Sequence, residues 1–273
     1  MIIDLHAYLT RIGLPGGHPP TVDTLRAVHR AHMLGIPFEN LDPVLGSAPS
    51  LALSDLEAKL VHGGRGGYCY EQNTLLAAAL TALGFRVTLL TARVLVGAKP
   101  GEIRPRTHML MLTQVPDEPV PFVTDVGFGS IGALLEPIPL IAGAELRDLP
   151  RHHRLAQEPH DGPLDLWKLQ TYVPQDDTWE DQYSFTVEPF EACDYEVINW
   201  HIATNPRSPF ARAVYAQRAL ADGTHLSLTG RRLTETAPDG AQETRELADT
   251  DEVLRVLRDA FGISLPDDTS LPE

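Results

Sequence analysis

The chain changes from a glycine-rich loop into a helix within the stretch GGRGGYCYEQNTLLAAALTALG, which spans residues 63–84. Four glycines among its first five residues interrupt regular structure, whereas the alanines and leucines that follow are strong helix formers. Gly84 stands where a helix commonly ends, because glycine readily adopts the left-handed conformation found just beyond a last turn. The stretch therefore predicts a loop that enters a helix near Cys69.

Cys69 occupies a position in which a thiol becomes a nucleophile. The free N–H groups and the dipole of a helix N-terminus stabilise a thiolate. Arg65 adds positive potential, and Gly66 and Gly67, followed by Tyr68, allow the backbone to come close to a substrate. A cysteine is more often a buried structural residue, but this context favours an activated thiol.

On the N-terminal side of this stretch, apolar residues at helical spacing predict further helices. We expect them over residues 4–12, 21–34 and 54–61. Thr21 or Asp23 is the expected cap of the second helix.

Two finer expectations concern the same region. Ser54 and Glu57 have the spacing of a capping box at the start of the third helix. His29 and His32 share one face of the second helix, and we interpret them as surface residues.

From Phe85 onward, β-branched residues become frequent and indicate strands. Residues 135–163 contain many prolines and predict a long irregular connection, and a last amphipathic helix is expected over residues 251–261. Helices followed by strands, and then by a mixture of both, favour an α+β fold over a doubly wound sheet. The expected strands cover residues 86–96, 107–115, 122–126, 166–173, 183–187, 211–220 and 224–229.

Composition narrows the class of protein. The 273 residues suffice for one large domain or two to three small ones, and a net charge of −15 argues against a nucleic acid partner. Two cysteines form no disulfide framework, and Cys193 is interpreted as structural. The sequence has neither a leader peptide nor the ~20 apolar residues that span a bilayer, so we expect a cytoplasmic protein without membrane contact.

A thiolate nucleophile needs a base, and the base needs a group that orients it. His108 and Asp125 are polar residues in apolar, strand-like segments. A hairpin centred on residue 116.5, midway between them, would place them opposite each other. A hairpin centred on residue 118.5 would instead place Asp125 opposite Leu112, and the sequence alone leaves both registers open.

Other kinds of site have weaker support. His152 and His153 are adjacent, so they point differently in any regular element, and no third ligand is evident beside them. We therefore expect no metal. The glycine cluster lacks the Gly-Lys-Ser/Thr ending of a phosphate-binding loop, and no dinucleotide-binding fingerprint occurs.

Several segments resemble those of the arylamine N-acetyltransferases. The order of Cys69, His108 and Asp125 and the gaps between them are also similar to that family. The likeness extends over most of the chain, is specific in its first half and fades after about residue 212. The segments that carry it are RGGYCYEQN (65–73), IPFENL (36–41), THM (107–109), TDVGFG (124–129) and NPRSPF (205–210).

The resemblance implies a fold in three parts. Residues 1–84 would form a helical bundle with the nucleophile, residues 85–190 an antiparallel β-barrel with the histidine and aspartate, and residues 191–273 an α/β lid. It further implies a triad of Cys69, His108 and Asp125, as in cysteine proteases.

The resemblance also implies a reaction, the two-step transfer of an acetyl group from acetyl-coenzyme A to an aromatic amine or hydrazine. Backbone N–H groups at Cys69 or around Gly127 are candidate donors to the oxyanion. No motif places the coenzyme, and a homo-oligomer is left open. The residues expected at the substrate are Phe38, Val94, Gly127, Phe128 and Gly129.

Three other functions are compatible with these residues. The first is a related acyltransferase that forms amides from polyketide thioesters in antibiotic assembly. The second is a cysteine hydrolase or a transglutaminase-like enzyme, which uses the same three groups. The third is a binding protein that keeps the fold without catalysis.

Overall fold

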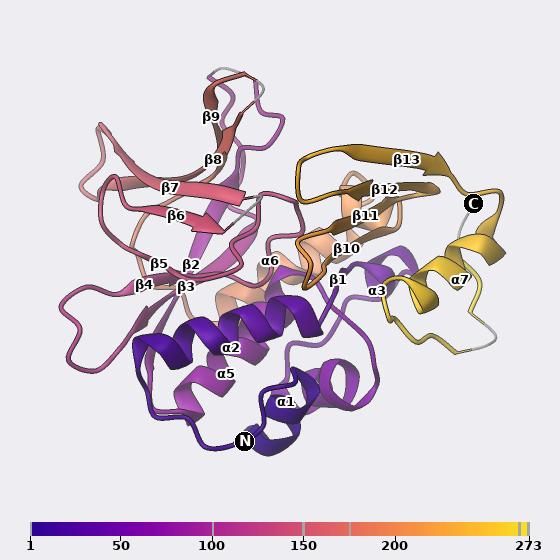
Figure 1. Ribbon diagram of the computed structural model, residues 1–273, viewed down its shortest axis with the longest axis horizontal. Coiled ribbons are helices and arrows are strands. Elements are labelled where there is room, and N and C mark those ends of the chain that lie inside the picture. Colours follow the sequence, from indigo (N-terminus) through magenta and orange to yellow (C-terminus); the bar gives the residue numbers. More distant parts are fainter. Residues whose placement is uncertain (1, 100, 149–150, 175, 267–268, 272–273) are drawn as a thin grey trace.

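The computed structural model describes residues 2–99, 101–148, 151–174, 176–266 and 269–271. In Figure 1, helices α1, α2 and α5 form one layer, a large curled sheet lies above them, and a smaller sheet with helix α7 lies to one side. The predicted α+β fold, with a helical bundle, an antiparallel barrel and an α/β part, is confirmed.

The helical layer is built around α5, which begins at Cys69 as the sequence predicts. Thr21 caps α2 by accepting a bond from the N–H of Thr24, and Gly84 has the expected positive φ beyond the end of α5. The helices of this part are α1 (Leu5–Arg11), α2 (Val22–Gly35), α3 (Leu41–Val44), α4 (Leu53–Leu56), the π-helical turn η1 (Glu57–His62) and α5 (Cys69–Ala82).

Two expectations for this layer are wrong. Helix α4 has Ala52 at its cap, with no side-chain cap bond, and Glu57 instead accepts a bond from the N–H of Asp4. His29 and His32 are fully buried, because each finds polar partners in the core that satisfy its ring nitrogens.

The large sheet is antiparallel and curls into a nearly closed barrel. Its strand order is β5-β4-β3-β2-β9-β8-β7-β6, and its interior holds apolar side chains such as Leu90, Leu155 and Phe185. The strands are β2 (Arg86–Val94), β3 (His108–Gln114), β4 (Phe122–Thr124), β5 (Ile138–Pro139), β6 (Glu145–Asp148), β7 (Arg151–Glu158), β8 (Leu166–Val173) and β9 (Thr178–Phe185).

The expected irregular connection over residues 135–163 is wrong, since β5, β6 and β7 lie within it. Strand β7 buries Arg151, His153 and Leu155 on one face. Two of these three residues are polar, so the alternation of apolar and polar residues that reveals a half-buried strand is hidden here.

The smaller sheet joins distant parts of the chain. Its order is β1-β10-β11-β12-β13, so the two residues of β1 pair with a strand that lies far along the sequence. Helix α7 packs on this sheet, and α6 and the 3-10 turn η2 precede it in the chain. The elements are β1 (Phe38–Glu39), α6 (Ala192–Thr204), η2 (Pro209–Ala211), β10 (Tyr215–Ala219), β11 (His225–Thr229), β12 (Arg232–Thr236), β13 (Gln242–Glu246) and α7 (Thr250–Asp259).

Asn40 fastens this sheet to the helical layer. Its side-chain amide donates to the carbonyls of Phe210 and Ala213, and its carbonyl oxygen accepts from the N–H of Tyr215. The residue is 1% exposed. Water therefore cannot replace these three bonds.

We expect Asn40→Ala to lower the free energy of unfolding by about 3 kcal/mol, because buried polar groups lose their partners. Urea denaturation followed by circular dichroism measures this value. Asn205→Ala is the control, since the bonds of Asn205 are exposed, and it should cost less than about 1 kcal/mol. Equal losses in the two variants would contradict the fastening role of Asn40.

Candidate active site

The first turn of α5 presents the thiol of Cys69. Tyr68 precedes the helix, and its N–H donates to the carboxylate of Glu71 at 3.1 Å. Gly66 is packed so closely that a Cβ there would lie 2.1 Å from the carbonyl oxygen of Pro37. Gly67 forms a parallel bridge with Phe38. The loop thus fits against the neighbouring segment only because Gly66 lacks a side chain.

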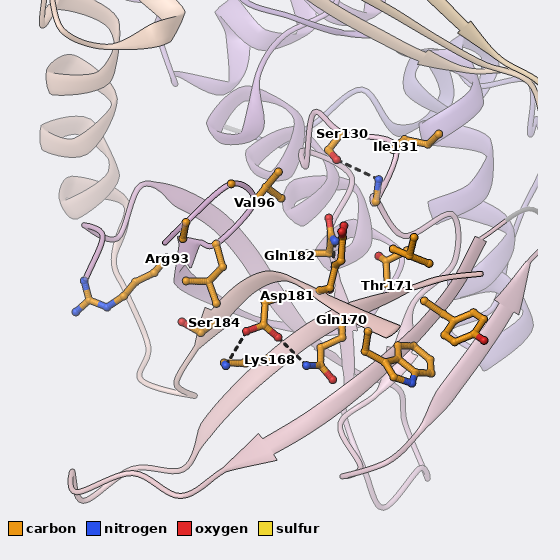
Figure 2. A pocket seen from close by; sticks show the side chains of 18 of the residues that line it. Arg93, Val96, Ser130, Ile131, Lys168, Gln170, Thr171, Asp181, Gln182 and Ser184 are labelled. Carbon is orange, nitrogen blue, oxygen red and sulfur yellow. Dashed lines mark hydrogen bonds and ion pairs between the residues drawn. The ribbon is translucent and has the colours of Figure 1, made fainter. Parts of the chain in front are cut away.

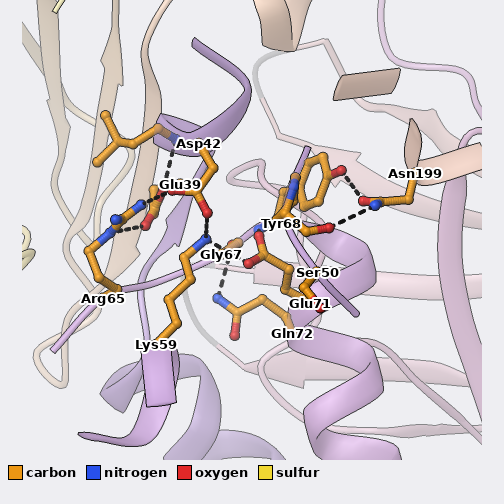
Figure 3. A network of polar contacts seen from close by, with 12 residues as sticks. Glu39, Asp42, Ser50, Lys59, Arg65, Gly67, Tyr68, Glu71, Gln72 and Asn199 are labelled. Carbon is orange, nitrogen blue, oxygen red and sulfur yellow. Dashed lines mark hydrogen bonds and ion pairs between the residues drawn. The ribbon is translucent and has the colours of Figure 1, made fainter. Parts of the chain in front are cut away.

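A network of buried and partly buried charges holds this loop, as Figure 3 shows. Arg65 donates to Glu39 and Asp42, each at 2.8 Å, and Lys59 donates to Asp42 at 2.7 Å and to Glu71 at 2.6 Å. Burial raises the pKa of Glu71 to about 7, although the charge of Lys59 opposes this shift. The carboxylates compensate the charge of Arg65, so the arginine anchors the loop instead of adding positive potential at the thiol.

His108 and Asp125 meet as a buried pair. His108 is the first residue of β3, and its Nε2 lies 2.7 Å from Oδ2 of Asp125. The His108 ring also interacts with the thiol of Cys69. Because Nε2 faces the carboxylate, Nδ1 is the ring atom left for the sulfur. The structure therefore brings together the three residues singled out in the sequence.

Both hairpin registers considered from the sequence are wrong. Met111 pairs with Thr124 and Leu112 with Val123, which centres the hairpin on residue 117.5. Asp125 lies just beyond the end of β4 and reaches His108 from the loop, not from a strand position opposite it. Strand alternation alone could not have given this contact.

The pKa values of His108 and Asp125 are shifted in opposite directions. Burial lowers the pKa of His108, but the Asp125 carboxylate and the Cys69 thiol outweigh it and raise that pKa to about 10. Burial of Asp125 is likewise outweighed by the charge and hydrogen bond of His108, and the pKa of this carboxyl is lowered. The ring therefore keeps its proton at neutral pH, which is the state that stabilises a neighbouring thiolate.

Asn73 is a residue of the site whose role the sequence did not reveal. It follows Cys69 by four residues and so lies on the same face of α5. Its amide nitrogen donates to Oδ1 of Asp125 at 3.0 Å and to the carbonyl of Met109 at 2.7 Å, and its oxygen accepts from the N–H of Val126. The four-residue spacing from the thiol is the signal that could have identified it.

The loop after Asp125 lies directly against the thiol. A Cβ on Gly127 would lie 2.5 Å from the Cα of Cys69, so only glycine allows this approach. The N–H of Gly127 donates to Oδ1 of Asp125 at 3.0 Å. Gly129 packs so closely that a Cβ there would be 2.6 Å from the ring of Phe38.

Aromatic rings surround the histidine. The centroids of Phe128 and Tyr183 lie 5.1 Å and 5.2 Å from that of His108, and Tyr183 was not singled out from the sequence. Phe38 is 8% exposed, so it is less open than its loop position suggests. Val94 ends β2 opposite Tyr183. Gly127 and Phe128 thus lie against Cys69 and His108, whereas Val94 is connected to the imidazole through Tyr183.

A groove of about 1520 Å³ reaches the loop that follows Asp125, where Ser130, Ile131 and Gly132 line it. Figure 2 shows Ser130 and Ile131 on one side of it and Lys168, Gln170 and Asp181 of the barrel on the other. Cys69, His108 and Asp125 do not line the groove, but Ser130 does, and Ser130 directly follows Gly129. The end of the loop whose Gly127 packs against Cys69 therefore forms part of the groove wall.

The sequence has well-matched counterparts among known proteins. A family model described as N-acetyltransferase matches residues 21–270. An arylamine N-acetyltransferase from Mycolicibacterium smegmatis is 37% identical over 269 residues, which cover 98% of this chain and 94% of that relative. The chain belongs to the arylamine N-acetyltransferase family. It is therefore an acetyltransferase, and the resemblance seen in its motifs is confirmed.

Solved structures of this family share the fold of the chain. The arylamine N-acetyltransferase of Nocardia farcinica superposes with a TM-score of 0.88 at 42% identity, covering 97% of this chain and 90% of that one. The Mycobacterium marinum arylamine N-acetyltransferase in complex with CoA gives a TM-score of 0.87 at 34% identity, covering 95% of this chain and 93% of that one.

Cys193 does not have the buried position expected of a structural cysteine. Cys193 is exposed on α6, so it is not part of a core. Among the described residues, no group of three or more His, Cys, Asp or Glu side chains is arranged to hold a metal ion. In that same part of the chain, no helix combines the length and apolar character of a membrane span.

We expect Asp125→Asn to lower the pKa of His108 by at least ~2 units, since the carboxylate charge is the main cause of the rise. Imidazole nitrogen shifts in NMR measure this value. The raised pKa stabilises the folded wild type fully below pH 6.5, and this contribution is lost as the pH rises toward about 10. The variant should lack this decline, and an unchanged His108 titration would contradict the assignment.

We expect Gly127→Ala to lower acetyltransferase activity about a hundredfold, because a displacement of ~1 Å at a reacting group has that effect. Gly17→Ala is the matched control, since a Cβ on Gly17 meets nothing within 4 Å. Initial rates with acetyl-coenzyme A and an aryl amine compare the two variants with wild type. Full activity in Gly127→Ala would show that the loop does not constrain Cys69.

Proposed function

We propose that this family member transfers an acetyl group from acetyl-coenzyme A to an aryl amine or aryl hydrazine through an acetyl-Cys69 intermediate. The observation that carries the proposal is the arrangement of Cys69 at the start of α5, in contact with a His108 ring that Asp125 holds. A thiol, a base and an orienting carboxylate in this order form a nucleophilic triad.

The first half-reaction begins with the proton of Cys69 on His108. The thiolate attacks the carbonyl carbon of the acetyl thioester, a new carbon–sulfur bond forms to Cys69, and the bond to the coenzyme sulfur breaks. The imidazolium gives its proton to the leaving coenzyme thiolate. Asp125 keeps the ring oriented through Nε2 and stabilises its positive charge while the proton is present.

In the second half-reaction, the amine is the nucleophile and Cys69 is the leaving group. The amine nitrogen attacks the acetyl carbon, His108 accepts the proton from that nitrogen, and the bond to the Cys69 sulfur breaks. The amide leaves, and the thiolate–imidazolium pair is restored. Aryl amines suit this step because their lone pair is free at neutral pH.

The oxyanion of both steps needs a donor. Two candidates follow from the sequence, the N–H of Cys69 and the N–H groups around Gly127. The N–H groups of Gly127 and Val126 already donate to Asp125 and Asn73. We assign the oxyanion to the N–H of Cys69, because it lies at the positive end of the helix dipole.

The surroundings suit an aromatic acceptor and a coenzyme donor. Phe38 and Phe128 provide flat apolar surfaces next to the thiol loop and the imidazole, and the relatives are named for arylamines. The groove beside Ser130 offers the coenzyme a route to Cys69, and a Mycobacterium marinum relative is known in complex with CoA. Because a reduced thiol and acetyl-coenzyme A are both required, we place the protein in the cytoplasm.

Incubation with acetyl-coenzyme A alone should add one acetyl group, because the first half-reaction needs no acceptor. Intact-mass spectrometry detects the adduct, and a later addition of an aryl amine should remove it. Cys69→Ala should abolish the adduct. Cys193→Ala, which replaces the exposed cysteine, is the matched control and should retain it.

Two results of this experiment would overturn the proposal. One is an adduct that survives Cys69→Ala, and the other is a wild-type protein that forms no adduct when the excess coenzyme is removed. A larger acyl thioester tested beside acetyl-coenzyme A separates the amide-forming acyltransferase considered above, since only that enzyme should prefer the larger group.

A further inference from the structure

Helix α2 carries two histidines that the mechanism does not use. His29 and His32 are three residues apart, so they lie on the same face of the helix, and both have zero exposed area. Burying a polar ring is costly unless both of its nitrogens find partners. The hydrogen bonds of these two rings connect His29 to Asp125 and His32 to the loop before Cys69.

His29 bonds the backbone of Asp125. Its Nε2 accepts the N–H of Asp125 at 3.2 Å, so the proton of the neutral ring is on Nδ1, which donates to the carbonyl of Leu135 at 3.0 Å. One ring thereby fixes the backbone of Asp125 relative to α2 and to the end of the loop that follows. The carboxylate can point at His108 only while this backbone stays in place.

His32 supports the glycine loop before Cys69 through Gln72. The amide nitrogen of Gln72 donates to the carbonyls of Pro37 and Gly67, which fixes its oxygen as the acceptor of a bond from Nε2 of His32 at 2.7 Å. Nδ1 of His32 then accepts from the hydroxyl of Tyr8 at 2.8 Å. The chain of bonds ends at the glycine loop that leads into Cys69.

Both rings are uncharged at neutral pH. Burial lowers the pKa of His29 to about 4, against the opposing charge of Asp125. Burial lowers the pKa of His32 to about 3, although the bond to Gln72 opposes this shift, and the charge of Arg11 from α1 acts in the same direction as burial. A neutral His29 leaves the negative charge of Asp125 to His108, whereas a charged ring in that place would compete for it.

We propose that His29 and His32 are positioning residues for the acetyl-transfer site, with His29 aligning Asp125 and His32 aligning the Cys69 loop through Gln72. This inference rests on the proposed function, since it takes Cys69, His108 and Asp125 as the reacting group and its partners. Helix α2 then acts as one rigid reference for two segments that lie far apart in the sequence.

The test follows Cys69 alkylation by iodoacetamide across pH, without coenzyme, together with the NMR titration of His108. We expect His29→Leu to slow alkylation at pH 7 at least tenfold and to lower the His108 pKa, because Asp125 loses its backbone anchor. His29→Gln should stay within threefold of wild type, since one amide can accept from Asp125 and donate to Leu135. In an Asp125→Asn background, His29→Leu should have no further effect on the His108 titration.

His32 should give a different signature. We expect His32→Leu to slow alkylation and to change the His108 pKa less than His29→Leu does, because only Cys69 has lost its support and Asp125 is the larger cause of the raised pKa. If His29→Leu fails to fold, His29→Asn replaces it. This variant is polar but too short to span both partners, and we expect it to lie between wild type and the full loss.

His153→Leu is the matched control. His153 is equally buried and its Nε2 bonds the carbonyl of Gly132, but this contact does not reach the triad. It should lose less stability than His29→Leu, because His153 gives up one bond where His29 gives up two, and it should keep the wild-type profiles. If the His29 variants only lose stability, with unchanged alkylation and His108 titration, the inference is overturned. If these profiles shift but wild type forms no acetyl adduct, the positioning role stands and the proposed function fails.

Discussion

A buried carboxylate must receive a hydrogen bond at each of its oxygens, and this requirement on Asp125 organises the centre of the molecule. Its donors are His108 from β3, Asn73 from α5 and the N–H of Gly127 from its own loop. Because the residue is 1% exposed, water cannot take the place of any of them. The helical layer, the barrel and the loop must therefore meet at one point, and the thiol of Cys69 lies at that point because α5 begins there.

Much of this arrangement follows from local sequence. The glycine cluster and the alanine-rich run predict where α5 begins, Thr21 predicts the cap of α2, and the change to β-branched residues after Phe85 predicts the barrel. These signals are local because propensity, capping and turn chemistry act within a few residues. The partners of Cys69 came from the family resemblance, since the sequence offered 11 histidines and left two hairpin registers open.

The features that could not be predicted are those in which polar groups satisfy one another over long sequence separations. Arg65 looks like a free positive charge until Glu39 and Asp42 are seen beside it. The buried histidines of α2 look like surface residues for the same reason, and the polar residues of β7 conceal a strand. In each case the partner comes from another element, and a pattern of apolar residues carries no information about it.

Strand β1 has a consequence for synthesis on the ribosome. Phe38 and Glu39 join a sheet whose next strand is Tyr215–Ala219, and Asn40 bonds carbonyls 170 and 173 residues further along. The segment that packs on the glycine loop before Cys69 thus gains its sheet partner only after about four-fifths of the chain has emerged. Domains generally fold in order as they emerge during translation, but this one cannot complete its reactive centre early. A truncated chain would keep the thiol sequence and lack the strand that supports its surroundings.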